Sequence, residues 1–188
     1  MRKGLVSSVL VLLVLFLSVG FGMAGNGKGG GGTGGGGGTT SLLTEEEASD
    51  IIFLREEEKL ARDVYLAMFE LYQAQIFANI SVSEQRHMDA VKGLIDKYGI
   101  EDPVIDDTPG VFANTDLSEL YTHLINKGLL SLKDALEVGV IIEKMDIYDI
   151  EVEMIPDATQ QDVKRVLANL LAGSYNHLDA FTKQLEPL

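Results

Sequence analysis

Apolar residues recur at steps of three and four along most of the chain after residue 41, a spacing typical of one face of an α-helix. The alternation of apolar and polar residues that indicates a half-buried strand is not found convincingly in the sequence. Proline, which interrupts helices, is confined to Pro103, Pro109, Pro156 and Pro187. The pattern therefore predicts an all-α domain over residues 41–188.

Four long helices and one short helix are expected within this domain. The long helices cover about 41–72, 76–98, 131–154 and 157–185, and the short helix covers about 117–126. The first starts after Ser41 or Thr44, because Thr44 and Glu47 have the spacing of a capping box. Gly99 is expected to end the second helix, and Ser131 to cap the third. The short helix, which ends at Gly128, is then a connector between the second and third long helices.

One stripe of each long helix is apolar except near its middle. The four stripes are Ile51, Leu54, Glu58, Ala61, Tyr65 and Met68; Phe77, Ile80, Glu84, His87, Val91 and Leu94; Leu132, Leu136, Gly139, Glu143, Asp146 and Ile150; and Val163, Leu167, Leu170, Ser174, His177 and Phe181. Because apolar stripes pack together, we expect a four-helix bundle with polar residues at the centre of its core.

Three adjacent glutamates, Glu56, Glu57 and Glu58, fan across a wide arc of the first helix. Glu58 lies on the apolar stripe, so its carboxylate is expected to face the core. Glu57 lies about 100° further round the helix and is the flanking alternative.

Burying several carboxylates on converging helices requires neutralisation by protons or cations. Two divalent metal ions would balance the carboxylates of Glu58, Glu84, Glu143 and Asp146, and two imidazoles would add nitrogen ligands. Glu84 and His87 have the i, i+3 spacing that dinuclear carboxylate sites in helix bundles use. The predicted ligands are therefore Glu58, Glu84, His87, Glu143, Asp146 and His177.

Several residues of the stripes also have an ordinary structural interpretation. His87 alone could be a hydrogen-bonded core residue, and Glu143 with Asp146 could be solvated charge. Tyr65 could be plain core or could donate a hydrogen bond to a ligand carboxylate. The metal site is favoured because every polar interruption falls at the middle of its stripe.

The formal net charge of −14 excludes the basic surface that nucleic acids or anionic membranes would require. We therefore expect no nucleic-acid partner. The sequence has no cysteine, which rules out disulfides and a lipidated-cysteine anchor.

Residues 1–24 have the order of a secretory signal peptide: a basic start at Arg2 and Lys3, an apolar run over 9–19, and small residues before Ala24. A retained membrane anchor is the alternative, because the segment is just long enough to span a bilayer. Residues 25–40, almost all glycine, are expected to be a flexible linker. The expected location is therefore outside the cytoplasm, either released or tethered through residues 1–24.

Two of the predicted helices resemble motifs of rubrerythrin-type proteins. The stretch EKLARDVY (58–65) is similar to their first-helix motif, and this similarity selects Glu58 over Glu57. The stretch FANISVSEQRHMDAV (77–91) is similar to their second helix, with Glu84 and His87 at ligand positions. Residues 42–181 as a whole resemble an uncharacterised bacterial and archaeal family of ferritin-like domains of unknown function.

This resemblance implies a ferritin-like four-helix bundle that holds two iron ions, with manganese or zinc as alternatives. It implies a ferroxidase-like or peroxidase-like di-iron oxidoreductase, although a metal-storage protein or a metal-free structural bundle stays open. Ser174 stands where rubrerythrins have a glutamate and Asp146 where a glutamate is usual, so a bridging ligand is absent or comes from Asp146 or water. The cysteine-containing rubredoxin module is absent, so turnover would need an external electron donor. A homodimer is left open.

Overall fold

The computed structural model describes residues 43–187, and every regular element in this part of the chain is a helix. The elements are α2 (Glu45–Tyr72), α3 (Gln75–Tyr98), α4 (Thr115–Gly128), α5 (Leu132–Tyr148), the π-helix η1 (Asp149–Met154), α6 (Ile155–Asp157) and α7 (Gln161–Leu185). The prediction of an all-α fold is therefore confirmed for the described residues.

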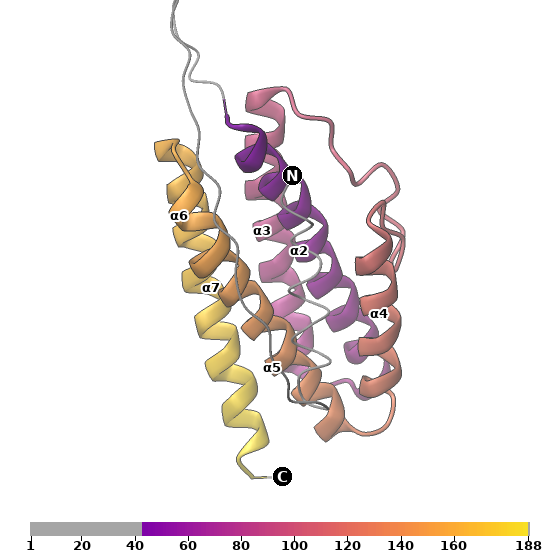
Figure 1. The fold of residues 1–188 in the computed structure, drawn as a ribbon. Helices are drawn as coiled ribbons and strands as arrows, with labels where there is room; N and C mark the ends of the chain where they lie inside the picture. The colour runs from indigo at the N-terminus through magenta and orange to yellow at the C-terminus, as the bar shows by residue number, and fades with distance from the viewer. Residues whose placement is uncertain (1–42, 188) are drawn as a thin grey trace, which may run out of the picture. The chain divides into compact units, whose positions relative to one another are not determined.

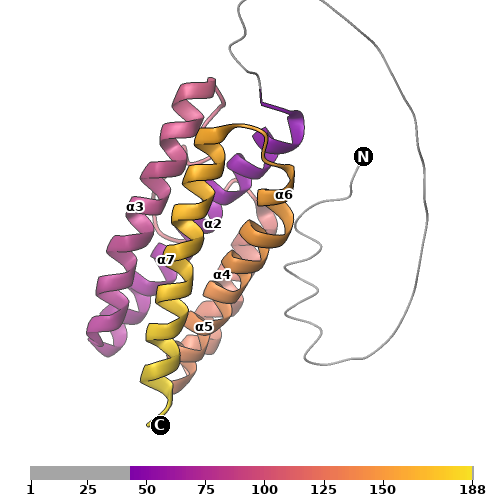
Figure 2. The ribbon, with the colours of Figure 1, turned by 90° about the vertical axis from the view of Figure 1, so that its left-hand side faces the viewer.

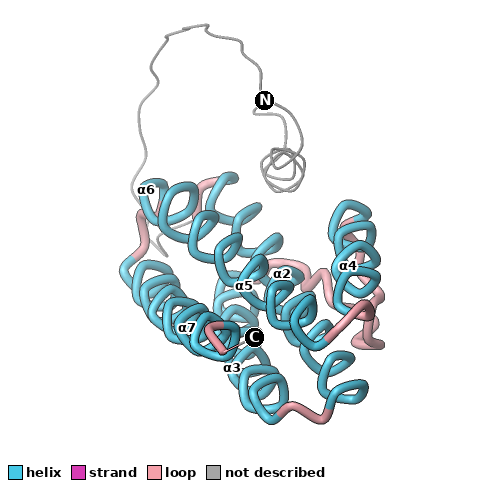
Figure 3. The backbone as a smooth tube through the Cα atoms, turned by 90° about the horizontal axis from the view of Figure 1, so that it is seen from below, coloured by secondary structure: helices cyan, strands magenta, loops and turns pink. Residues whose placement is uncertain are grey.

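The long helices pack side by side as a bundle. Helices α2 and α3 form an antiparallel pair, and α5, continued by η1 and α6, forms a second antiparallel pair with α7 (Figure 1). Helix α7 also lies against α3, as the turned view shows (Figure 2). Seen along the helices, α4 lies outside the group formed by α2, α3, α5 and α7, next to α2 (Figure 3). Because segment 99–114 and α4 lead the chain back along the bundle, α3 and α5 run in the same direction.

Most of the expected helix boundaries are confirmed. The Thr44 side chain accepts the Glu47 N–H, and the Glu47 carboxylate accepts the Thr44 N–H, which completes the capping box at the start of α2. Gly99 adopts a left-handed conformation (φ 67°) and ends α3. Ser131 caps α5 by accepting the Asp134 N–H. The connector between the long helices is α4.

The start of the fourth long helix was predicted wrongly. Asp157 belongs to α6, Ala158 is extended, and α7 begins at Gln161. The cause is a tertiary contact: the Glu47 carboxylate accepts the backbone N–H groups of Thr159 and Gln160. A contact with a residue more than 100 positions away cannot be read from local periodicity.

The four predicted stripes form the core, with one exception. Leu132, at the first position of its stripe, is 37% exposed, whereas the other stripe residues are buried. At one end of the core, the rings of Tyr65, Phe77 and Phe181 pack together, with centroids 5.2–6.3 Å apart. Gly139 leaves space for this cluster, because a Cβ there would lie 2.6 Å from the Phe181 ring.

Helix α2 is buried on all sides over residues 53–65. Its outer face forms ion pairs that hold segment 99–114: Arg55 with Asp102, and Arg62 with Asp107. Lys59 is fully buried and donates to Asp63 and to the Thr108 carbonyl. Charged residues that a surface helix would expose are thus enclosed by the connector.

The predicted leader (1–24) and the glycine-rich linker (25–40) lie outside the described residues. None of the helices within residues 43–187 combines the length and the apolar character that crossing a membrane requires.

Candidate metal centre

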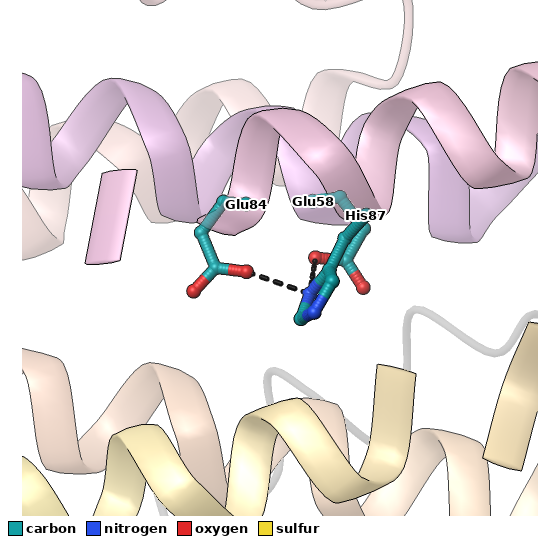
Figure 4. A group of neighbouring side chains, drawn as sticks. All are labelled: Glu58, Glu84 and His87. Carbon is teal, nitrogen blue, oxygen red and sulfur yellow. Dashed lines mark hydrogen bonds and ion pairs between the residues drawn. The ribbon is translucent and has the colours of Figure 1, made fainter. Parts of the chain in front are cut away.

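The first group of candidate ligands consists of Glu58 from α2 with Glu84 and His87 from α3. These side chains point into the space between the α2–α3 pair and the α5–α7 pair (Figure 4). His87 Nδ1 lies 3.2 Å from Glu58 Oε2 and 2.8 Å from Glu84 Oε2. One ligand atom from each residue lies within 4.8 Å of the other two, which is close enough for all three to contact one metal ion.

The second group repeats this arrangement with Glu84, Glu143 from α5 and His177 from α7. His177 Nδ1 lies 2.8 Å from Glu84 Oε1 and 3.4 Å from Glu143 Oε2. These three residues also offer ligand atoms within 4.8 Å of one another. The two imidazole rings stack with their centroids 5.5 Å apart.

Glu84 belongs to both groups and turns a different oxygen toward each. Its Oε2 faces His87 and its Oε1 faces His177, and both distances are 2.8 Å. Neither oxygen is aligned for a hydrogen bond with its histidine, although both are buried. Close approach without hydrogen-bond alignment is expected for atoms arranged around a common ion. Glu84 is therefore placed as a carboxylate that could bridge two cations.

The centre has many buried polar atoms with no hydrogen-bond partner. Glu58 Oε1 and both oxygens of Asp146 have none. Both oxygens of Glu84, Glu143 Oε2 and His177 Nδ1 also lack an aligned hydrogen bond, although each lies 2.8–3.4 Å from an ion-pair partner. Buried polar atoms are nearly always satisfied in folded proteins, because each unsatisfied group costs about 1–3 kcal/mol. Such a concentration of lone pairs in one place fits a cation bound by these oxygen and nitrogen atoms.

Burial and mutual repulsion also shift the protonation of the centre. Burial raises the pKa of Glu58 to about 7, and burial together with Glu84 raises that of Glu143 to about 8. Burial opposes charge on the histidines, but Glu58 and Glu84 raise the pKa of His87 to about 10. Glu143 and Glu84 likewise raise the pKa of His177 to about 9. Without a cation, this site therefore holds protons at neutral pH.

Asp146 is fully buried beside the centre but belongs to neither group. Its pKa is raised well above the ordinary value by burial and by the carboxylates of Glu58, Glu57, Glu143 and Glu84. Asp146 therefore lies near the other five predicted residues. It is not close enough to the residues of either group to be counted as a member of that group.

The structure shows which groups the hydroxyls of two further stripe residues, Tyr65 and Ser174, contact. The Tyr65 hydroxyl donates a 2.6 Å hydrogen bond to Glu143 Oε1, so Tyr65 orients a candidate ligand in addition to packing in the core. The Ser174 hydroxyl donates to the Leu170 carbonyl within its own helix. Ser174 is fully buried, and its hydrogen bond turns the hydroxyl toward the backbone.

Asp149 and Gly173 lie near the centre but were not given roles by the sequence analysis, and Glu57 was named only as the flanking alternative to Glu58. Glu57 and Asp149 form a second buried carboxylate pair next to Glu58 and Asp146. Gly173 faces His87, because a Cβ at this position would lie 2.5 Å from His87 Nε2. Asp149 lies three positions after Asp146, as Asp146 lies three positions after Glu143. This regular spacing could have identified Asp149 from the sequence. Gly173 gave no signal in a single sequence.

Comparison with known proteins gives one curated relative and two similar solved structures. Over 143 residues the chain is 51% identical to "Uncharacterized protein MJ0754" of Methanocaldococcus jannaschii, covering 76% of this chain and 77% of that protein.

The crystal structure of hypothetical protein MJ0754 from Methanococcus jannaschii superposes with a TM-score of 0.77 at 48% identity, covering 81% of this chain and 86% of that one. A DUF305 fragment from Deinococcus radiodurans superposes with a TM-score of 0.58 at 13% identity, covering 78% and 99% of the two chains. The second likeness concerns the fold alone. Residues 47–187 match the family described as "Uncharacterized protein domain (DUF2202)", and the chain belongs to that family.

Proposed function

We propose that this protein binds two iron or manganese ions in the centre of a ferritin-like bundle and uses them in redox chemistry. The chemistry would be oxidation of ferrous iron by oxygen or peroxide, or removal of peroxide. The observation that supports this most directly is the geometry of Glu84, which presents one oxygen to each of two Glu–His pairs. Dinuclear carboxylate sites in bundles combine glutamates from two helices with Glu-x-x-His pairs from the other two, and Glu84 with His87 is one such pair.

The path of the chain supports the ferritin-like part of this proposal. Ferritin-like bundles differ from simple up-and-down bundles by one long crossover connection. Here segment 99–114 and α4 form such a connection between α3 and α5. The motifs EKLARDVY and FANISVSEQRHMDAV, which resemble those of rubrerythrins, place Glu58, Glu84 and His87 on the first antiparallel pair.

The type of ligand favours iron or manganese. The candidate donors are carboxylate oxygens and imidazole nitrogens, with no thiolate anywhere in the chain. Such ligands suit iron and manganese, and zinc is the alternative that they also accept. When bound, a pair of iron or manganese ions would supply the one-electron redox steps of the proposed chemistry.

The chain's own residues have distinct parts in this proposal. Glu58 with His87 would hold one ion, and Glu143 with His177 the other, while Glu84 joins the two. Tyr65 orients Glu143 through its 2.6 Å hydrogen bond. Asp146 would supply a further carboxylate to the centre, whereas Ser174 has only a hydroxyl, which donates to the Leu170 carbonyl.

A second candidate is a protein that stores or buffers metal without turnover. The nearly complete burial of the centre favours it, since Glu58, Glu84 and Glu143 are fully enclosed and the two histidines are each 8% exposed. A redox enzyme needs an open coordination position and a path for the oxidant, which a buffer does not need. Redox turnover would also require an external electron donor, because the chain has no cysteine to hold an iron–sulfur or rubredoxin-type relay.

Metal counting tests the proposal directly. The protein is freed of metal, loaded anaerobically with iron(II), and its iron content and optical spectrum are recorded before and after air is admitted. We expect the central pair to fill and a new absorption band to form in air, and we expect Glu84→Gln to lose both. Iron binding without any spectral change in air would favour storage. If neither iron nor manganese binds, the proposed function is wrong.

The proposed location is outside the cytoplasm, with residues 1–24 removed or kept as a tether. The basic and apolar order of this segment supports the proposal. N-terminal sequencing of the mature protein should begin near Gly25. An intact Met1 in the membrane fraction would instead identify residues 1–24 as an anchor.

A further inference from the structure

Glu57 and Asp149 form a buried carboxylate pair outside the two ligand groups. Glu57 is 2% exposed and Asp149 is 1% exposed. Neither oxygen of Glu57 has a hydrogen-bond partner, and the same is true of Asp149 Oδ2. The two carboxyl groups lie close enough to share a proton, so each faces the other.

The positions of both residues follow from the helices that hold them. Glu57 precedes Glu58 and is turned by about 100° around α2, so it faces past the ligand stripe. Asp149 is the first residue of the π-helix η1, three positions after Asp146. Figure 1 shows that α5 and η1 run opposite to α2, so Asp149 follows Asp146 in the direction in which Glu57 precedes Glu58. π-Helices in α-helices are frequently found at functional sites.

Two other buried acids on α2, Glu56 and Asp63, are bonded through both oxygens, which distinguishes them from this pair. Glu56 accepts the backbone N–H groups of Ala113 and Asn114. Asp63 is held by Lys59 and Arg62. The fold therefore supplies donors to buried carboxylates elsewhere on the same helix.

Other acids lie within electrostatic range of the pair or of one another. Asp50 is buried and lies within range of Glu153 and Asp157. Glu153 in turn acts on Asp149, and Glu57 acts on Asp146. Negative charge around the pair favours a cation there.

We propose that Glu57 and Asp149 bind a third divalent cation next to the dinuclear centre. Two carboxylates, with water completing the coordination shell, suit a hard cation such as manganese(II) or iron(II). The inference rests on the proposed function for the identity of the metal, but it uses different residues. A cation here would replace the proton that the two carboxyl groups can otherwise share, and it would coordinate three buried oxygens that accept no hydrogen bond from any other residue.

The test is equilibrium dialysis of the full-length, metal-free protein against manganese(II), followed by counting of bound metal per chain. The parent is expected to bind three ions, and the double variant Glu57→Gln with Asp149→Asn is expected to bind two. The amide side chains keep the size of the originals and can bond to each other. Asp149→Asn alone gives the same comparison if the double variant does not fold. Glu70→Gln, which removes an exposed acid of α2, is the matched control and should bind three ions.

A second variant, Glu58→Gln with Glu143→Gln, separates this inference from the proposed function. Two ions in both the parent and Glu57→Gln with Asp149→Asn would overturn the third site and leave the dinuclear centre standing. One ion that persists in Glu58→Gln with Glu143→Gln, in a parent that binds three, would support both sites. A parent that binds a single ion, which persists in this variant but is lost in Glu57→Gln with Asp149→Asn, would support the third site and overturn the dinuclear centre. Binding of no ion by the parent would overturn both.

Discussion

Glu56, Glu57 and Glu58 follow one another in α2, and each buried carboxylate has a different environment. Glu56 is bonded to the backbone at the start of α4, Glu57 faces Asp149, and Glu58 faces His87. Three adjacent side chains of a helix cover about 200° of its circumference, so they can all be buried only if the helix is enclosed. Single substitutions in this run should therefore have separate effects.

Glu58→Gln should reduce metal affinity by at least about tenfold, because a candidate ligand loses its charge. Glu56→Gln should keep metal binding but destabilise the fold by about 1–3 kcal/mol, since an amide offers only one acceptor to two buried N–H groups. Manganese titration and thermal melting of both variants measure the two effects. Equal loss of metal in both variants would contradict the assignment of Glu58.

Gly173→Ala is expected to weaken metal binding by moving the His87 ring. A Cβ at this position would lie 2.5 Å from Nε2, so the ring must move from its present position beside Glu58 and Glu84. Gly93→Ala is the matched control in α3, because a Cβ there meets no atom within 4 Å. This control should stabilise the protein by about 1 kcal/mol and leave metal binding unchanged. Unaltered metal affinity in Gly173→Ala would show that the glycine does not position His87.

At the scale of elements, α2 has two functional faces. One face presents Glu58 to the centre, and the other holds segment 99–114 through Arg55, Lys59 and Arg62. Lys59 is fully buried, and its amino group is 2.6 Å from Asp63. It also lies 4.6 Å from the centroid of the Phe112 ring, so the connector encloses its charge.

Asp63→Ala should destabilise the protein strongly, because it leaves the buried Lys59 without its carboxylate partner. Removing one member of a buried ion pair typically costs about 3–5 kcal/mol. Asp179→Ala removes the partner of Lys183 in an exposed pair, and we expect the melting temperature to change little. Chemical denaturation of both variants compares the two pairs. A small effect of Asp63→Ala would mean that Arg62 and the segment 99–114 adjust to the loss.

For the whole molecule, the buried centre links stability to pH and to metal. The pKa of Glu58 is raised to about 7 and that of Glu143 to about 8, so the folded, metal-free protein binds protons that the unfolded chain releases. The pKa values of His87 and His177 are raised to about 10 and 9. At higher pH these histidines likewise keep protons in the folded protein that they lose in the unfolded chain.

The metal-free protein should therefore lose stability as pH rises from 5 to 9. The carboxyl contributions are fully present below the unfolded pKa near 4.5 and are lost through about 7 to 8, and the histidine contributions are lost through about 9 to 10. Saturating manganese should raise the melting temperature more at pH 8 than at pH 5, because protons compete for the same ligand atoms.

Melting curves at several pH values, with and without manganese, measure both trends. Glu58→Leu with Glu143→Leu is the control, because it removes two of the shifted carboxyl groups and two ligands. This variant should have a flatter pH profile and no response to metal, and it can be more stable than the metal-free parent. A parent that melts like this variant, with no response to metal, would contradict a buried metal site.

Much of the architecture was accessible from the sequence. The capping box at Thr44 and Glu47, the glycine at 99 and the cap at Ser131 are local signals, and the structure confirms each of them. The stripe periodicity predicted the burial of Glu58, Glu84, His87, Glu143, Asp146 and His177, all of which are buried. The bounds predicted for the first two long helices differ from those of α2 and α3 by one or a few residues.

The sequence by itself determined which residues line one face of each helix, because helical periodicity and capping depend only on neighbours along the chain. It could not determine which faces meet. Three contacts join residues from different helices. Glu84 lies between His87 and His177, Glu57 faces Asp149, and Glu47 accepts backbone N–H groups just before α7. Only the tertiary structure decides these contacts, because each depends on how helices far apart in the chain pack against one another.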